Sequence, residues 1–188
     1  TSRLTCRSSL AWSTKKAFSF VVEAGVVSEE RDVDVIEYDF FLKENDSTKI
    51  IESYDVVLDG TDNIEARELI NQHCVKLGKP LIFGGVSGWE GLVSLLVYKN
   101  SACFSCIFTN SEKRPAFFDC SSEGVLGVTT SLVGTLMVAE TIKLICNTGQ
   151  LLTNKLLICD ALSGVTEILN VQKKLMDEGL LHEKILIF

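Results

Sequence analysis

The sequence predicts an α/β protein whose sheet is mostly parallel, with antiparallel strands added towards the C-terminus. Two observations predict this class. The short apolar run Val56–Leu58 stops at acidic and glycine residues, as a buried parallel strand does where it reaches a ligand site. Near the C-terminus, Lys155–Asp160 and Val165–Val171 are strand-like runs joined by residues 161–164, which predicts a hairpin.

The segment 59–63, with the sequence Asp-Gly-Thr-Asp-Asn, separates the first of these strands from a helix. Asp62 and Glu65, three residues apart, form a D-x-x-E version of the capping box, and Gly78 marks the helix end. The next strand is expected at Leu81–Phe83. Open α/β sheets bind ligands beyond the carboxyl ends of their strands, so Asp62 lies where a nucleotide or its metal would bind. The alternative is that Asp62 only caps the helix.

Further elements are expected on both sides of this centre. We predict helical turns at 17–24 and 46–53, strands at 33–40 and 92–98, and a long apolar helix at 125–146. The glycine-containing passage Gly84–Gly91 predicts turns, or a close approach of the backbone to a ligand. The long helix carries Glu140, Lys143 and several hydroxyl residues, which argues against a membrane span.

Composition excludes several classes of function. A chain of 188 residues with 46% hydrophobic and 23% charged residues is typical of one globular domain. The net charge of -7 argues against a nucleic-acid partner, because phosphate binding requires a basic surface. The seven cysteines lack disulfide-scaffold spacing, and Thr1–Leu10 lacks an apolar core. We therefore expect a cytoplasmic protein without a membrane partner.

Three motifs in the same order resemble the HesA/MoeB/ThiF family of adenylating enzymes, which are related to ubiquitin-activating enzymes. They are D-x-T-D-N-x-x-x-R-x-x-x-N at 59–71, K-P-L-I-F-G-G-V-S-G-W-E-G at 79–91 and C-x-x-C at 103–106. The resemblance implies a Rossmann-like, incomplete doubly wound sheet, with a partial adenylation domain over 1–170 and a divergent tail over 171–188.

The resemblance also implies an activity and its partners. Family members use ATP and Mg²⁺ to adenylate the C-terminal glycine of a small ubiquitin-like or sulfur-carrier protein that ends in Gly-Gly. They are homodimers, to which the long helix contributes. From this resemblance we expect the same substrates, the same cofactors and a homodimer for this chain.

Site residues follow from the resemblance position by position. Arg3 and Lys16 have the spacing of the arginine and lysine that reach the ATP phosphates, and Asp62 and Asn63 stand in the nucleotide and metal site. Composition alone would make the basic start of the chain a solvated terminus. Cys120, ahead of a Glu-Gly-Val run, corresponds to a cysteine that accepts the activated carrier or joins in sulfur transfer. Taken alone, a single cysteine is more often a buried small hydrophobe.

Cys103 and Cys106 have the spacing of a zinc half-site. Family members usually supply a second C-x-x-C near the C-terminus, and this sequence has none. The pair is therefore either two zinc ligands or two free thiols, and two ligands alone bind a metal weakly.

The start of the sequence departs from the family pattern. No G-x-G-x-x-G loop occurs in residues 1–54, where Gly25 is the only glycine. The sequence therefore resembles a family member without its first β-α-β unit. The alternative function is a non-catalytic homologue that binds the carrier or dimerises with a complete partner. A nicotinamide dehydrogenase shares the sheet topology but leaves T-D-N and C-x-x-C unexplained.

Overall fold

The computed structural model describes residues 38, 44–108 and 124–173. Arg3, Lys16 and Cys120, like the elements expected before residue 38, lie outside these residues. The described elements are α2 (Glu44–Glu52), β1 (Val57–Asp59), α3 (Ile64–Leu77), β2 (Leu81–Ser87), β3 (Glu90–Leu96), the 3₁₀ turn η1 (Tyr98–Asn100), α4 (Phe104–Ile107), α6 (Gly127–Cys146), β4 (Lys155–Asp160) and β5 (Val165–Asn170).

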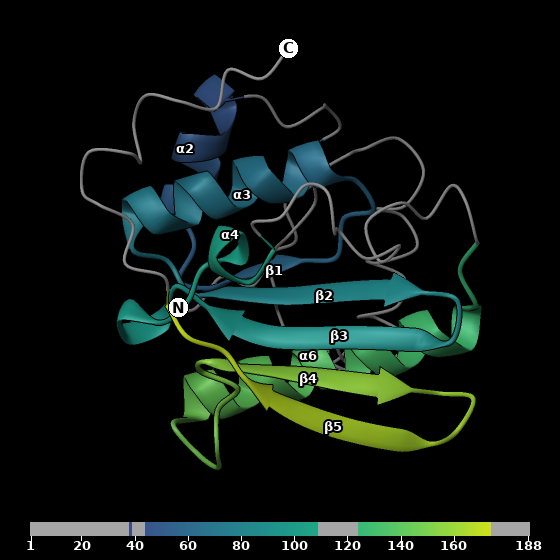
Figure 1. Ribbon diagram of the computed structural model, residues 1–188. Helices are drawn as coiled ribbons and strands as arrows, with labels where there is room; N and C mark the ends of the chain where they lie inside the picture. Colours follow the sequence, from purple (N-terminus) through teal and green to yellow (C-terminus); the bar gives the residue numbers. More distant parts are fainter. Residues whose placement is uncertain (1–37, 39–43, 109–123, 174–188) are drawn as a thin grey trace, which may run out of the picture.

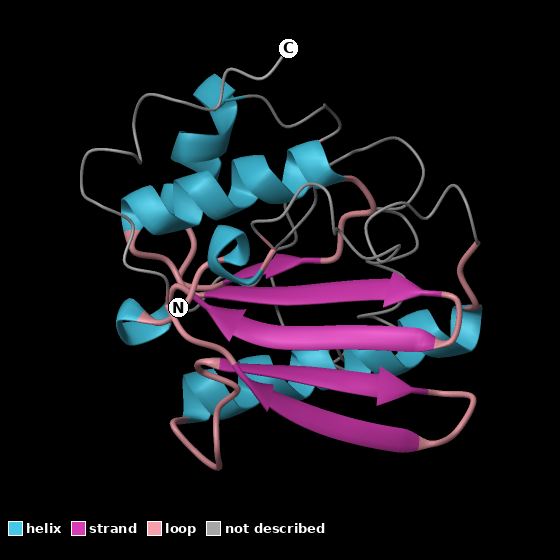
Figure 2. Cartoon of the chain, in the orientation of Figure 1, coloured by secondary structure: helices cyan, strands magenta, loops and turns pink. Residues whose placement is uncertain are grey.

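These strands form one five-stranded sheet in the order β1-β2-β3-β4-β5 (Figures 1 and 2). The β1–β2 pair is parallel, and the three pairings from β2 to β5 are antiparallel. The predicted α/β class with antiparallel C-terminal strands is confirmed, including the hairpin between β4 and β5. Within the described residues the parallel part of the sheet is the β1–β2 pair, linked by α3 as a crossover.

The prediction that Gly84–Gly91 forms turns is wrong for most of that passage. Strand β2 continues to Ser87, and β3 starts at Glu90, so only Gly88 and Trp89 form the turn between them. Gly88 has φ +51°, which glycine adopts at no steric cost. The other glycines lie within the strands, where their missing side chains leave room for neighbouring elements.

Helices cover both faces of the sheet centre (Figure 1). On one face, α2, α3 and α4 enclose a core whose sheet residues include Leu81 and Phe83. On the other face, α6 packs against β2 and β3, over a core that includes Ile82, Val93 and Met137. Alternate residues of β2 therefore point into different cores, which explains why the Leu-Ile-Phe run is apolar without alternation.

By length and composition alone α6 could cross a membrane, since its mean hydropathy reaches 1.4. Here the helix lies along the sheet, with Thr129, Val133 and Met137 buried. Glu140 is buried as well, and its Oε1 accepts a hydrogen bond of 2.6 Å from the Leu152 amide. The helix therefore packs on the sheet and does not cross a membrane here, as the sequence predicted. Its buried carboxylate is satisfied by a hydrogen bond.

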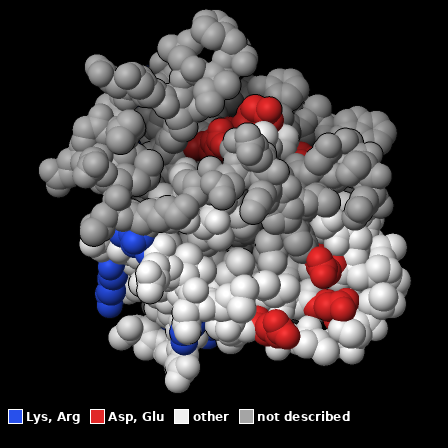
Figure 3. Space-filling view, in the orientation of Figure 1, with Lys and Arg blue, Asp and Glu red and all other residues white. Residues whose placement is uncertain are grey.

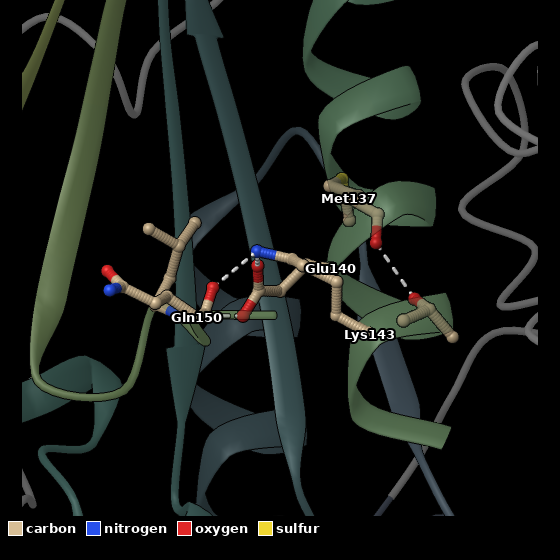
Figure 4. A network of polar contacts seen from close by, with 6 residues as sticks. Met137, Glu140, Lys143 and Gln150 are labelled. Atoms are coloured by element: carbon tan, nitrogen blue, oxygen red, sulfur yellow. Dashed lines mark hydrogen bonds and ion pairs between the residues drawn. The ribbon is translucent and has the colours of Figure 1, made fainter. Parts of the chain in front are cut away.

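Glu140 also belongs to a polar network that holds the connection between α6 and β4 (Figure 4). Its Oε2 forms an ion pair with Lys143 one turn later. Lys143 Nζ then donates a 2.8 Å hydrogen bond to the Gln150 carbonyl. Each carboxylate oxygen of the buried Glu140 thus has a partner. The network therefore fixes the direction in which the chain enters β4.

We expect Gly91→Ala to destabilise the fold by about 1–3 kcal/mol through overpacking. A Cβ at residue 91 would lie 2.3 Å from Val133 Cγ2 and 2.7 Å from Cys159 Sγ, so α6 and β4 would have to shift. Urea unfolding measures the loss. A second substitution, Val133→Ala, opens space for the new methyl group, so the double variant should lose less stability than the two single variants summed.

Gly127→Ala in α6 is the matched control, because a Cβ there meets no atom within 4 Å. It should leave the free energy of unfolding within about 0.5 kcal/mol of the original. Equal losses for Gly91→Ala and Gly127→Ala would show that backbone freedom, rather than contact with α6, requires glycine at residue 91.

Candidate functional site at the end of strand β1

The loop between β1 and α3 places three different polar side chains within four residues. Asp59, the last residue of β1, is only 1% exposed. Thr61 is also buried, whereas Asp62 is exposed to solvent. The strand therefore ends on a buried carboxylate and the loop presents a second carboxylate outward, at the carboxyl end where α/β sheets bind ligands.

Two buried charged residues hold Thr61 from opposite sides. Asp59 Oδ1 accepts hydrogen bonds from the Thr61 amide at 2.9 Å and from Thr61 Oγ1 at 2.7 Å. Arg67, which is 2% exposed, donates from Nε to the Thr61 carbonyl at 3.1 Å and also from Nη2 to the same oxygen. The guanidinium of Arg67 lies over the Phe83 ring, 4.9 Å from its centroid. Every polar group of Thr61 is thus bound, which fixes the loop next to Asp62.

The prediction that Asp62 caps α3 is wrong, because the capping residue is Asn63. Asn63 has extended backbone angles, and its Oδ1 accepts a 2.8 Å hydrogen bond from the Ala66 amide. Asp62 contacts Asn63 Nδ2 at 3.4 Å within the described residues. Capping therefore does not explain an aspartate at residue 62, and its carboxylate is left accessible to a ligand.

Asn63, Arg67 and Asn71, which follow one another at four-residue intervals, form a polar face of α3 that binds backbone groups. Asn63 caps its own helix, and Arg67 holds the preceding loop. Asn71 Oδ1 accepts a 2.9 Å hydrogen bond from the Phe104 amide, at the start of the C-x-x-C helix α4. One helix thus connects the loop with Asp62 to the cysteine pair.

The cysteine pair is close but incomplete as a metal site. Cys103 Sγ and Cys106 Sγ lie 2.8 Å apart, with Cys106 buried and Cys103 partly exposed. The hydrogen bond that Cys103 Sγ shares with Cys106 Sγ, together with burial, raises the pKa of Cys103 far above that of an ordinary thiol. No group of three or more histidine, cysteine or acidic side chains that could hold a metal is found in the described part of the chain.

We therefore expect the described pair to bind zinc weakly. Structural Zn²⁺ takes four ligands, and this pair supplies only two of them. Treatment with EDTA should leave the melting temperature of the protein unchanged. Dialysed protein should contain less than one mole of zinc per mole of chain. Stoichiometric zinc that is lost in the Cys103→Ser variant would contradict this expectation and would require further ligands from outside residues 38, 44–108 and 124–173.

The donor set at the β1 end fits a divalent cation and its nucleotide. Carboxylates are hard oxygen ligands of the kind that Mg²⁺ prefers, and it usually takes one or two of them together with phosphate oxygens. Asp62 is accessible, and Asp59 Oδ2 is buried without a hydrogen-bond partner among the described residues. The structure brings Asp62 and Asn63 together here, whereas Cys103 and Cys106 lie at α4.

Asp59 and Arg67 both stand at fixed positions of the D-x-T-D-N-x-x-x-R motif, but neither was predicted to be a site residue. The available signal for Asp59 was an acidic residue placed directly after an apolar strand. Figure 3 shows the described basic and acidic side chains of one face in small separate groups.

The ThiF family model matches residues 14–179. The protein named adenylyltransferase and sulfurtransferase MOCS3 from Arabidopsis thaliana is 36% identical over 140 residues, covering 74% of this chain and 30% of that protein. The protein of the same name from Dictyostelium discoideum is 37% identical over 127 residues, covering 67% of this chain and 30% of its own length. This chain thus spans about 30% of the length of these relatives.

Solved structures agree in fold. The crystal structure of E. coli MccB with selenomethionine MccA superposes with a TM-score of 0.65 at 18% identity, covering 83% of this chain and 48% of that chain. The structure of E. coli MccB with ATP gives a TM-score of 0.62. The likeness supports the predicted Rossmann-like α/β fold, and the match of the family model extends over most of the sequence. The chain belongs to the ThiF family.

Proposed function

We propose that this chain carries out ATP-dependent adenylation of the C-terminal carboxylate of a small ubiquitin-like or sulfur-carrier protein ending in Gly-Gly. Membership of the ThiF family supports the reaction class, and the names of the MOCS3 relatives describe an adenylyltransferase. The observation that carries the proposal is the exposed Asp62 at the end of β1, held on a loop that buried charges fix.

In this reaction a carboxylate oxygen of the carrier attacks the α-phosphorus of ATP. The bond to the pyrophosphate oxygen breaks, and the products are an acyl-adenylate and pyrophosphate. The protein contributes orientation and charge neutralisation rather than covalent chemistry. Bound Mg²⁺ would neutralise phosphate oxygens, and Asp62, beside Asn63, would hold it. Arg3 and Lys16 are proposed to bind the phosphates, Arg3 as a planar clamp and Lys16 as a compact charge.

A second step is proposed for Cys120. Its thiolate would attack the acyl carbon of the adenylate, forming a thioester and releasing AMP. The adjacent Glu-Gly-Val run and the family position support this role. A Cys120→Ser variant would then keep pyrophosphate exchange but lose the thioester conjugate with the carrier, which free thiols cleave by acyl transfer.

We also propose a cytoplasmic homodimer that uses the outer face of α6. Four large apolar side chains of this helix are exposed to solvent. Their exposed fractions are 58% for Val128, 39% for Leu132, 49% for Ile142 and 48% for Ile145. Such a stripe on a packed helix supports a subunit interface in a family member. Analytical ultracentrifugation of a Leu132→Glu variant would give monomers if this face is used.

Exchange of labelled pyrophosphate into ATP tests the proposed reaction. We expect exchange that depends on a small carrier protein ending in Gly-Gly. The matched control is the same carrier without its last glycine, which should support no exchange because its carboxylate no longer reaches the α-phosphorus. Exchange at the same rate with both carriers, or with no carrier, would contradict the proposed substrate.

A second candidate function is supported by the absence of a G-x-G-x-x-G loop from residues 1–54. The chain would then bind the carrier, or dimerise with a complete homologue, without adenylating anything. Isothermal titration separates the two functions. Micromolar binding of the carrier with no ATP binding supports the second function, and tight ATP binding by the chain excludes it.

A further inference from the structure

Asp59 has a feature that its structural role leaves unexplained. Its Oδ1 accepts both hydrogen bonds from Thr61, so the carboxylate is turned towards the loop that carries Asp62. Its Oδ2 is buried and lacks a hydrogen-bond partner among the residues that the structure describes. The residue as a whole is 1% exposed.

An oxygen of this kind requires a partner. A buried carboxylate oxygen loses its hydration on folding, and a native protein normally replaces this with a donor or a cation. If Asp59 served only to hold Thr61, a neutral acceptor such as asparagine would suffice. The negative charge and the second oxygen therefore suit a ligand that binds at the loop.

We propose that Asp59 is a second carboxylate of the cation–nucleotide site, and this inference rests on the proposed function. Asp62 would hold the divalent cation. Asp59 Oδ2 would bind the same cation, directly or through one of the water molecules that the cation carries. Mg²⁺ retains several waters when it binds through carboxylates, so a recessed carboxylate can act on it in either way.

The two oxygens of Asp59 thus have different tasks. Oδ1 fixes the loop by binding Thr61, and Oδ2 binds or orients the ligand. Groups that orient a metal or its waters in this way typically change metal affinity when they are replaced. This predicts that the charge of Asp59 matters for the cation more than for the loop.

The test measures Mn²⁺ binding to the full chain in the presence of ATP, by electron paramagnetic resonance of free Mn²⁺. Asp59→Asn keeps an oxygen that can accept from Thr61 and removes the charge. We expect it to weaken the affinity for Mn²⁺–ATP by about 10- to 100-fold. The matched control is Asp55→Asn, the same change at an exposed residue before the other end of β1, which should bind within about twofold of the original.

Each outcome decides the inference. A folded Asp59→Asn variant that binds Mn²⁺–ATP within twofold of the original overturns it, since Oδ2 would then bind only a structural water. Absence of Mn²⁺–ATP binding by the original chain overturns the proposed function, and this inference with it. If the original chain and Asp59→Asn bind Mn²⁺–ATP equally well, the proposed function is unaffected, and only the role of Asp59 in the cation site is excluded.

A measurement on the unchanged protein covers the case in which Asp59→Asn does not fold. Aspartate labelled with ¹³C at the side-chain carboxyl allows electron–nuclear double resonance to detect carboxylate carbons near bound Mn²⁺. Two distinct carbon couplings in the Mn²⁺–ATP complex support the inference. A single coupling overturns it, because Asp62 would then be the only aspartate at the cation.

Discussion

Asp62→Ala is expected to lower the rate of pyrophosphate exchange by about 100- to 1,000-fold, which is the usual effect of removing one group that stabilises developing charge. The free energy of unfolding should stay within about 0.5 kcal/mol of the original, because Asp62 is exposed and Asn63 caps the helix. Exchange kinetics and urea unfolding of the same preparation measure the two effects.

Glu65→Ala is the matched control for this substitution. Glu65 is also exposed and acidic and lies in the first turn of α3, so its removal changes the charge near the loop by the same amount. It should reduce exchange only slightly, because it does not lie at the end of β1. Equal losses in the two variants would mean that general charge near the helix start, rather than the Asp62 carboxylate, supports the reaction.

The strands and helices were predictable where the pattern is local. The observed β4 (Lys155–Asp160), β5 (Val165–Asn170) and α6 (Gly127–Cys146) differ from the sequence prediction by at most two residues at an end. Apolar runs bounded by turn residues define these elements without reference to the rest of the chain. Local patterning was sufficient for the architecture of this half of the sheet.

The role of the glycines was not predictable from local sequence. Residues 84 and 91 must be glycine because a Cβ at either position would collide with side chains of α6, which packs against β2 and β3. Helix α6 follows more than thirty residues later in the chain. A pattern of glycines near a predicted turn suggests more turns. Only the packing of a distant helix shows that strands continue through these positions.

The candidate site was predicted in part, and the missing part is the buried layer beneath it. The D-x-T-D-N spacing identified Asp62, but it also indicated Asp62 as the cap that Asn63 in fact forms, since either side chain can accept from an amide of the first turn. The four-residue spacing of Asn63, Arg67 and Asn71 places these polar residues on one face of the helix. The sequence alone does not show that this face is turned inward onto the Thr61 carbonyl.

Arg67→Met is expected to destabilise the protein by about 1.5–3 kcal/mol, because it removes the charged donor that binds the carbonyl of the buried Thr61. It also removes the contact over the Phe83 ring. Arg67→Lys keeps the charge but lacks the planar fork, so an intermediate loss is expected. Urea unfolding measures both variants.

A double-mutant cycle with Asp59→Asn tests whether Asp59 and Arg67 act together on Thr61. Because both residues bind Thr61, the double variant should lose at least about 1 kcal/mol less than the two single variants summed. If each residue acts alone, the losses will instead add within about 0.5 kcal/mol. Additive losses would therefore show that Asp59 and Arg67 hold the loop independently.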